Sequence, residues 1–255
     1  MQQSATRALS PRKLLDANRS YYDSLWSGAQ LVEPDRFNTW PLIRALLPPG
    51  ARCLEVAPGL RPRLPLEQTQ FVDVSGPALA KLAQSGASVV GALITSLPFA
   101  AASFDLVCAL DIVEHVDDDA AALAELSRVA RPGAAVLLSV PLHPELWNAF
   151  DDFVGHRRRY RPEVLADTLS RHGLTIERSA AYGMQPRSSR LLDVGMWFLT
   201  HQRERALWWY NRVLMPMGLR LQKKLEFRTG LIATRDVDEI LMICRKGPAA
   251  AVSGY

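Results

Sequence analysis

The sequence has only three cysteines among its 255 residues, which is too few for a disulfide framework. Cys53, Cys108 and Cys244 each lie within an apolar run, and we expect them to be reduced core thiols of a cytoplasmic protein. No stretch approaches the roughly 20 apolar residues of a membrane span. The first residues lack the apolar segment of a secretory signal, so we expect no signal peptide. Disulfide-rich, membrane-spanning and secreted classes are therefore disfavoured.

Several signatures of chemistry are missing as well. No G-x-S-x-G turn occurs, which disfavours a serine hydrolase of the common kind. No Cys-x-x-Cys pair occurs and the five histidines are scattered along the chain, so we expect no metal site. Charge of one sign does not dominate, because 30 basic and 26 acidic residues leave a net +4. This mild excess suits an anionic ligand or a membrane surface, and without a recognition motif we expect no nucleic-acid partner.

Apolar runs alternate with helical patterns from about residue 51 onward. Hydrophobic residues make up 48% of the sequence and charged ones 22%, as in an ordinary globular protein. Such alternation is typical of a parallel sheet covered by helices. We predict seven strands, at residues 52–56, 70–74, 88–92, 104–109, 134–140, 174–181 and 239–244.

Helical patterns fill the intervals and flank the sheet. Residues 76–85, 118–130 and 162–172 are predicted helices, with a cap-like Ser75 before the first and Gly173 after the last. Residues 12–47 are predicted to be mostly helical. The expected division is an N-terminal helical cap (1–50), a core (51–182), a helical insertion (183–230) and the last core strand with a tail (231–255).

Two acidic residues stand where strands are predicted to end. Glu55 lies in Cys53-Leu54-Glu55-Val56-Ala57-Pro58-Gly59, and Asp73 closes the second strand in Phe71-Val72-Asp73-Val74. In an open α/β sheet, ligands bind beyond the carboxyl ends of the strands, where a carboxylate can hold ribose hydroxyls. The alternatives are that the loop after the first strand is only a packing turn and that Asp73 only caps the next helix.

Further motifs follow in a fixed order. They are Leu97-Pro98-Phe99, Phe104-Asp105-Leu106-Val107, Asp111-Ile112-Val113-Glu114-His115, and Arg131-Pro132-Gly133 before an apolar strand. Over residues 51–140 the chain resembles the class I methyltransferases that depend on S-adenosylmethionine, particularly their small-molecule group. The resemblance implies an α/β, Rossmann-like, mostly parallel sheet of seven strands with helices on both faces, and S-adenosylmethionine as the cofactor.

The same resemblance implies a set of cofactor-binding residues. They are Glu55, Ala57, Gly59, Asp73, Val74, Leu93, Ile94 and Asp111. The glycine-rich loop of the family is degenerate here, because Ala57 and Arg61 replace its outer glycines. Leu93 stands where the family often has an aspartate for the adenine amine. These departures remove flexible backbone and a polar partner from the expected site.

Two histidines are the predicted catalytic residues. His115 follows the fourth strand, and His156 lies in Gly155-His156-Arg157-Arg158-Arg159-Tyr160, a run resembling methyltransferases of polysaccharide, lipid and natural-product pathways. An imidazole can accept a proton or line a pocket, and a purely structural role is the alternative for His115. A solvated basic turn is the alternative for the second run. The predicted substrate-side residues are Tyr22, Trp26, Trp147, Arg157 and Tyr160.

The predicted insertion is basic and aromatic. Residues 185–228 contain nine Arg or Lys against three acids, together with Trp197, Trp208 and Trp209. This composition suits a lid over an apolar or anionic acceptor or a peripheral membrane contact, and ordinary core packing is the alternative. The resulting hypothesis is methyl transfer to a small-molecule or lipid-like acceptor in a biosynthetic pathway. Its rivals are a methyltransferase-fold enzyme with another reaction, such as cyclisation, and a catalytically silent binding or membrane-associated partner.

Overall fold

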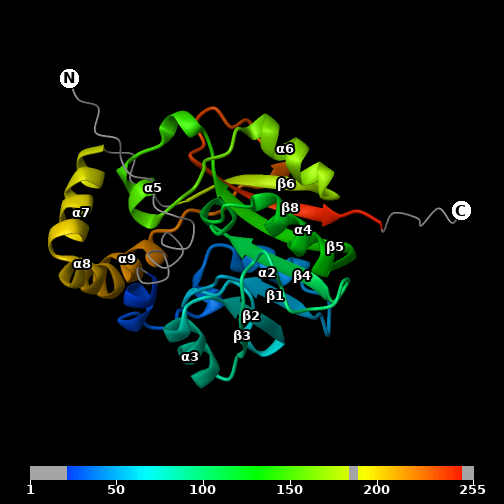
Figure 1. The fold of residues 1–255 in the computed structure, drawn as a ribbon, viewed down its shortest axis with the longest axis horizontal. Coiled ribbons are helices and arrows are strands. Elements are labelled where there is room, and N and C mark those ends of the chain that lie inside the picture. The colour runs from blue at the N-terminus through cyan, green and yellow to red at the C-terminus, as the bar shows by residue number, and fades with distance from the viewer. Residues whose placement is uncertain (1–21, 184–188, 249–255) are drawn as a thin grey trace, which may run out of the picture.

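The computed structural model describes residues 22–183 and 189–248. An eight-stranded sheet in the order β3-β2-β1-β4-β5-β8-β6-β7 forms the centre of this part of the chain (Figure 1). Strands β1 to β5 pair in parallel, and β8 runs antiparallel to both β5 and β6. In chain order the strands are β1 (Cys53–Val56), β2 (Thr69–Asp73), β3 (Ser88–Gly91), β4 (Phe104–Leu110), β5 (Ala130–Pro141), β6 (Leu174–Tyr182), β7 (Arg228–Thr229) and β8 (Glu239–Lys246).

The mostly parallel α/β sheet is confirmed, with one correction to the strand number. The additional strand is β7, whose two residues pair antiparallel with Arg178 and Ser179 of β6 at the sheet edge. Two exposed residues, Arg228 and Thr229, form no apolar run. Hydrophobic patterning therefore gives no signal for a strand at this place.

Helices cover both faces of the sheet. The α-helices of the core are α2 (Trp40–Leu46), α3 (Gly76–Gln84), α4 (Asp119–Val129), α5 (Ala149–Val154) and α6 (Pro162–Arg171). Short 3-10 turns are η1 (Pro34–Arg36), η2 (Leu66–Gln68), η3 (Val113–His115) and η4 (Pro144–Leu146). Residues 22–27 are helical, and the N-terminal part of the predicted cap lies outside the described residues.

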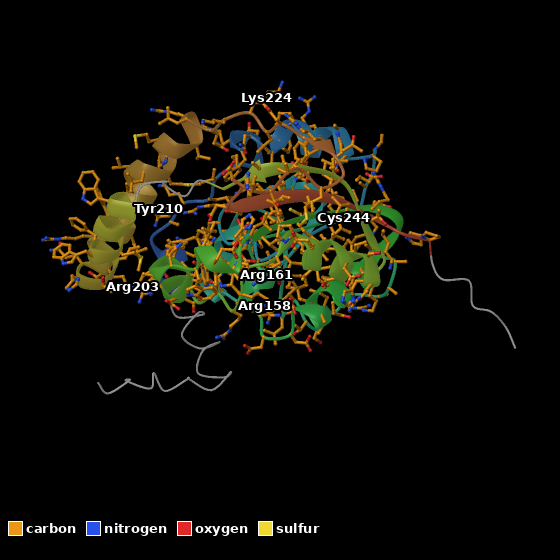
Figure 2. The ribbon with its side chains drawn as sticks, turned by 90° about the horizontal axis from the view of Figure 1, so that it is seen from above. Arg158, Arg161, Arg203, Tyr210, Lys224 and Cys244 are labelled. Atoms are coloured by element: carbon orange, nitrogen blue, oxygen red, sulfur yellow. The ribbon has the colours of Figure 1, made fainter. Side chains whose placement is uncertain are left out.

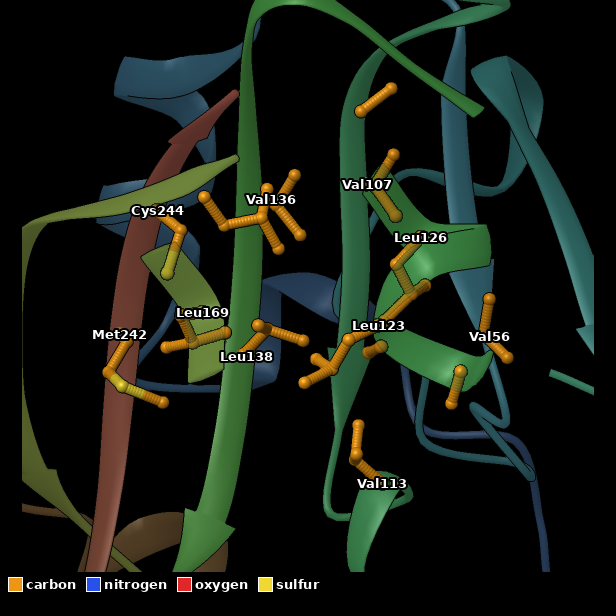
Figure 3. Packing of buried hydrophobic residues seen from close by; sticks show 14 of the residues in the cluster. Val56, Val107, Val113, Leu123, Leu126, Val136, Leu138, Leu169, Met242 and Cys244 are labelled. Carbon is orange, nitrogen blue, oxygen red and sulfur yellow. The ribbon is translucent and has the colours of Figure 1, made fainter. Parts of the chain in front are cut away.

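Alternating side chains of the strands supply two cores. Val136 and Leu138 of β5 pack with Leu126 of α4 and Leu169 of α6 on one face (Figure 3). The intervening Leu137 joins Ile43 of α2 on the other face. Successive side chains of a strand point to opposite faces, so a strand buried on both sides has the continuous apolar run seen in the sequence.

The connection from β1 to β2 contains no α-helix. It consists of residues 57–68, with only the 3-10 turn η2 at its end. Twelve residues are close to the minimum for a crossover between parallel strands, and three of them are prolines that restrict the backbone. The short connection leaves part of this face of the sheet without a helix of its own.

An N-terminal segment covers that part of the face. Leu25, Trp26 and Ala29 pack against Phe71 of β2 and Leu82 of α3 in one buried cluster. The ammonium group of Lys81 donates hydrogen bonds of 2.8, 2.8 and 2.7 Å to the carbonyls of Trp26, Ser27 and Ala29. A cation satisfies the unpaired carbonyls at a helix end. Lys81 thereby fixes the end of the helical residues 22–27.

The region before the last strand of the core is helical. It contains α7 (Ser189–His201), α8 (Arg203–Trp209), the π-helical turn η5 (Tyr210–Leu214) and α9 (Met215–Arg220). These helices lie together at one end of the molecule, beside α5 (Figure 1). Among the residues that the structure describes, no helix is both long and apolar enough to cross a bilayer.

Candidate active site

Asp73 organises the carboxyl end of β2. Its side chain is 6% exposed, and its two oxygens accept N–H groups of Gly59 (3.0 Å) and Ser75 (2.8 Å). Burial raises the pKa of Asp73, although these backbone hydrogen bonds oppose the shift. Asp73 therefore ties the loop after β1 to the start of α3, at the edge of the sheet where parallel α/β folds bind ligands.

Glu55 also stabilises the loop after β1, through hydrogen bonds to its backbone. Its carboxylate is 3% exposed and accepts the N–H of Arg63 at 2.9 and 3.0 Å and that of Leu64 at 2.9 Å. Burial raises the pKa of Glu55 to about 7, against the opposing effect of the backbone hydrogen bonds. Among the predicted cofactor residues, Glu55 thus has a defined role in folding the loop back toward β2.

An indole lies directly on the backbone of the loop. Gly59 has a φ of +55°, and a Cβ built on it would be 2.1 Å from the Trp26 ring. The guanidinium of Arg61 lies 5.0 Å from the Trp26 ring centroid and 4.9 Å from that of Tyr210, and it donates to the Tyr210 hydroxyl at 2.9 Å. Ala57 has a φ of +56°, a conformation that its side chain disfavours. The degenerate loop is therefore held by aromatic and cationic contacts.

The remaining predicted cofactor residues lie at the ends of neighbouring strands. Leu93 follows β3 and is 44% exposed, whereas Ile94 is 4% exposed and belongs to the core. Val74 is half-buried. Asp111 follows β4, is exposed, has a φ of +51° and accepts a hydrogen bond from Ser139 at 2.5 Å. Asp111 and Leu93 are thus accessible at the sheet edge.

The two predicted catalytic histidines lie side by side. Their ring centroids are 4.7 Å apart, and the hydroxyl of Tyr22 lies 3.3 Å from Nε2 of His115. Burial and the neighbouring charge of His156 lower the pKa of His115 to about 3, so His115 is neutral near pH 7. The expectation that the histidines are too far apart to share a ligand is wrong for this pair, because the turn after α5 returns His156 to η3.

Three residues that are not among the predicted site residues position His156: Asp151, Arg159 and Asp238. Asp151 is fully buried, and its Oδ1 lies 2.7 Å from Nδ1 of His156. Burial alone would raise the pKa of Asp151, but the hydrogen bonds from His156 and Arg159 hold it below its usual range. Arg159 also donates to Asp238 at 2.7 Å. An acidic residue near the start of a helix, such as Asp151, can be noticed in the sequence. Its hydrogen-bond partners can be assigned only once the fold is known.

The predicted substrate-side residues separate into two groups. Tyr22 and Trp26 lie with the histidines and the Gly59 loop. Trp147 is 38% exposed, and its indole donates to Asp152 at 3.1 Å. The guanidinium of Arg157 lies 3.2 Å from Asp117, and Tyr160 is buried with its hydroxyl donating to Asp119 at 3.0 Å. Trp147, Arg157 and Tyr160 are thus engaged by acids outside the histidine pair.

Comparisons with known proteins agree with this arrangement. Residues 56–138 match the family model described as a methyltransferase domain. The malonyl-[acyl-carrier protein] O-methyltransferase of Pseudescherichia vulneris is 36% identical over 107 residues, which are 39% of this chain and 43% of that protein. The matched part thus spans less than half the length of this curated relative.

Solved structures share the fold over most of the chain. Phosphoethanolamine N-methyltransferase 2 of Haemonchus contortus, in complex with phosphomonomethylethanolamine and S-adenosylhomocysteine, has a TM-score of 0.56 at 18% identity and covers 95% of this chain and 61% of its own. The [4+2]-cyclase SpnF has a TM-score of 0.53 at 16% identity, with 82% and 80% covered. At these identities the likeness is one of fold.

The fold is that of the class I S-adenosylmethionine-dependent methyltransferases. Residues 56–138 match a methyltransferase domain, in agreement with the motifs of the sequence. The residues fit the cofactor of that domain. Asp73 offers a carboxylate at the end of β2, Leu93 an exposed apolar side chain after β3, and Gly59 a backbone without a Cβ, against which Trp26 packs.

Replacing Gly59 by alanine tests the contact with Trp26. We expect Gly59→Ala to lower the free energy of unfolding by about 2 to 4 kcal/mol, because overpacking adds to the strain of a positive φ. Gly86→Ala is the matched control, since Gly86 has a φ of +83° and nothing within 4 Å of an added Cβ. It should cost only about 1 to 2 kcal/mol. Urea denaturation measures both, and equal losses would contradict the contact.

Titration of Glu55 predicts a pH dependence of stability. Its folded pKa of about 7 lies above the usual value of 4.5, so its contribution to stability is present at low pH and is lost as the pH rises through 7. We expect the free energy of unfolding to fall by up to about 3 kcal/mol between pH 4.5 and 7.5 from this group. Glu55→Gln should flatten this part of the profile, whereas Glu163→Gln, at an exposed position, should not. An unchanged slope in Glu55→Gln would refute the assignment.

Proposed function

We propose that the protein transfers the methyl group of S-adenosylmethionine to a small, lipid-like acceptor at an anionic membrane surface. The observation that carries the proposal is the methyltransferase domain at residues 56–138, whose second strand ends at the buried carboxylate of Asp73. At the same edge of the sheet lie His115 and His156, which supply polar groups to the acceptor side.

The cofactor, when bound, supplies an electrophilic methyl group on a sulfonium centre. An in-line displacement at that carbon depends mainly on the alignment of donor and acceptor. Asp73 would hold the ribose hydroxyls, and Leu93 would contact the adenine. Trp26 and Tyr22 cover this edge and exclude water, because both belong to the segment that Lys81 fixes on the sheet.

His115 is better suited to orient the acceptor than to remove its proton. A group with a pKa of about 3 is a weak base near neutral pH, although its neutral imidazole can accept or donate one hydrogen bond. His156 differs from His115 in having a carboxylate partner, Asp151, which fixes the orientation of its ring. The acceptor-side chemistry of the proposal therefore depends on His156 and its neighbours.

Cofactor titration tests the enzymatic part of the proposal. Calorimetry should show saturable 1:1 binding of S-adenosylmethionine to the full chain. Asp73→Asn should weaken it about 10- to 100-fold, because the variant loses hydrogen bonds to an ionised acceptor. Asp167→Asn, at an exposed position of α6, is the matched control and should leave the affinity for S-adenosylmethionine unchanged. A melting curve checks that Asp73→Asn is folded.

The outcomes separate the rival functions. Absence of saturable binding to the unaltered chain would contradict methyl transfer and support a silent binding partner. Binding with product of unchanged mass would support another reaction, such as cyclisation. Unchanged affinity in folded Asp73→Asn would remove this residue from the ribose position.

The membrane part of the proposal is supported by an unusual surface on α7 to α9. Trp197, Phe198, Trp208 and Trp209 are between 43% and 57% exposed. In the same helices and the residues that follow, basic residues outnumber acidic ones. The basic residues are Arg203, Arg205, Arg212, Arg220, Lys223 and Lys224. Figure 2 shows the helices of Arg203 and Tyr210 projecting to one side, away from the strand of Cys244.

Large apolar rings beside cations match an anionic lipid interface. Aromatic side chains enter the boundary between headgroups and acyl chains, and each cation near an anionic surface contributes about 1 kcal/mol. We refer to these aromatic and basic residues of 197–224 as the basic aromatic surface. It connects to the cofactor loop, because Tyr210 accepts a hydrogen bond from Arg61 and Leu207 packs in the cluster of Trp26.

Vesicle flotation tests the basic aromatic surface. We expect the protein to float with vesicles containing phosphatidylserine and to lose this binding with rising salt. The double variant Trp208→Ala and Trp209→Ala should bind at least tenfold less, since two exposed rings no longer enter the interface. Val164→Ala, which changes a 56% exposed residue of α6, is the control and should bind normally. Equal flotation with uncharged vesicles, or no loss in the double variant, would contradict the proposal.

A further inference from the structure

Three side chains with metal-binding groups meet behind Tyr22. Glu114, His115 and His156 each offer one ligand atom, and these atoms all lie within 4.8 Å of one another. Nε2 of His156 is 3.8 Å from a carboxylate oxygen of Glu114. Glu114 and His115 come from η3 and His156 from the turn after α5, so two elements of the core fix the group.

The tautomer of His156 follows from its neighbours. Asp151 accepts N–H groups of Arg159 at 2.9 and 3.0 Å and of Asn148 at 2.8 Å, as expected of an ionised carboxylate. Nδ1 of His156 is therefore the protonated nitrogen that donates to Asp151. Nε2 is the ring nitrogen that faces Glu114. Histidines that bind metals typically have this second hydrogen bond to a carboxylate.

The buried carboxyl group of Glu114 is incompletely paired. The side chain is 1% exposed, and its Oε2 has no hydrogen-bond partner. Its Oε1 lies 3.8 Å from Nε2 of His156, which is too long for a hydrogen bond. A buried carboxylate without a partner is costly, and it requires either a proton or a cation. A cation between Oε1 of Glu114 and Nε2 of His156 would supply the missing partner.

We propose that Glu114, His115 and His156 bind a divalent transition-metal ion such as Zn²⁺ or Co²⁺. Two imidazoles and one carboxylate are the ligand set of many catalytic zinc sites, and hard ions such as Mg²⁺ and Ca²⁺ prefer an all-oxygen set. Ligand atoms of a tetrahedral zinc ion lie about 3.3 Å apart. The group must therefore close by up to about 1.5 Å, which rotation of the Glu114 side chain can supply.

The consequence for catalysis rests on the proposed function, whereas metal binding does not. Three protein ligands leave one position open, and a hydroxyl or carboxyl oxygen of the acceptor can occupy it. A metal held by Glu114, His115 and His156 would lower the pKa of a coordinated hydroxyl, so that its proton could leave to solvent. The resulting oxygen would then accept the methyl group as the carbon–sulfur bond of the sulfonium breaks, which would give an O-methylated acceptor and S-adenosylhomocysteine.

Titration of the protein with Co²⁺ and Zn²⁺, in the absence of S-adenosylmethionine, tests the site directly. We expect one equivalent of Co²⁺ to bind with the visible absorption of a four- or five-coordinate ion, and Zn²⁺ to displace it. Glu114→Gln and His156→Asn should each weaken binding at least tenfold. Asp151→Asn should weaken it about 10- to 100-fold through the orientation of His156. Cofactor binding, measured separately, shows whether the proposed function itself fails.

Matched controls separate ligand loss from misfolding. Asp152→Asn changes the exposed neighbour of Asp151, and His143→Asn changes a histidine outside the group; both should bind Co²⁺ normally. Melting curves confirm that each variant is folded, and Glu114→Gln preserves the side-chain shape if Asp151→Asn does not fold. No saturable binding by the unaltered chain at 1 mM Co²⁺ would overturn the proposal, as would binding that Glu114→Gln and His156→Asn leave unchanged. His156 would then act as an ordinary base beside Asp151.

Discussion

The twelve residues between β1 and β2 impose the constraint on which the cofactor edge of this protein depends. A connection of this length, containing three prolines, joins the parallel strands without an α-helix. The apolar surface of Phe71 and Leu82 is then buried by Leu25 and Trp26 from the N-terminal segment. Burial of an aromatic side chain contributes on the order of 2 to 3 kcal/mol, so burial of Trp26 stabilises the packing of this segment on the sheet.

Carboxyl groups define the chemistry of the same edge, and their hydrogen-bond partners differ. Glu55 accepts three hydrogen bonds from two backbone N–H groups. Asp151 accepts hydrogen bonds from Arg159 and His156, which keep its pKa low. Glu239 lies against Asp111, and burial together with that carboxylate raises the pKa of Glu239 well above its usual range. Glu114, like Glu239, has one carboxylate oxygen without a hydrogen-bond partner, but its other oxygen faces Nε2 of His156 at 3.8 Å, which is the basis for placing a cation there.

The sequence predicts the core of the fold because strands buried on both faces have continuous apolar runs. The predicted ranges for β1 to β6 and β8 each overlap the observed strands, and Ser75 and Gly173 flank α3 and α6 as their cap chemistry indicates. Pattern alone misses β7, since two exposed residues produce no period. The interval between the first two predicted strands contains no predicted helix, and the structure has only the 3-10 turn η2 there.

Site residues are predicted less well because their partners are distant in sequence. His115 and His156 are 41 residues apart, and nothing in their local sequences indicates that their rings meet. Tyr160 shows the same dependence on the fold. The sequence predicts that it contacts substrate, whereas the structure buries its ring beside Leu142, with the hydroxyl donating to Asp119. The geometry of the loops therefore decides which polar residues near a strand end belong to the site.

Arg61 connects the two surfaces that the proposed function requires. Its guanidinium lies between the rings of Trp26, over the cofactor loop, and Tyr210, in the helical region that carries the basic aromatic surface. A planar cation between two aromatic rings favours one arrangement of both, because the cation–π attraction of each ring depends on the position of the same group. Movement of η5 when α7 to α9 meet a membrane would therefore change the environment of Arg61. Arg61 stands where the family often has the last glycine of the loop. Through its contact with Tyr210 it joins the loop after β1 to the basic aromatic surface, where we expect the acceptor to bind.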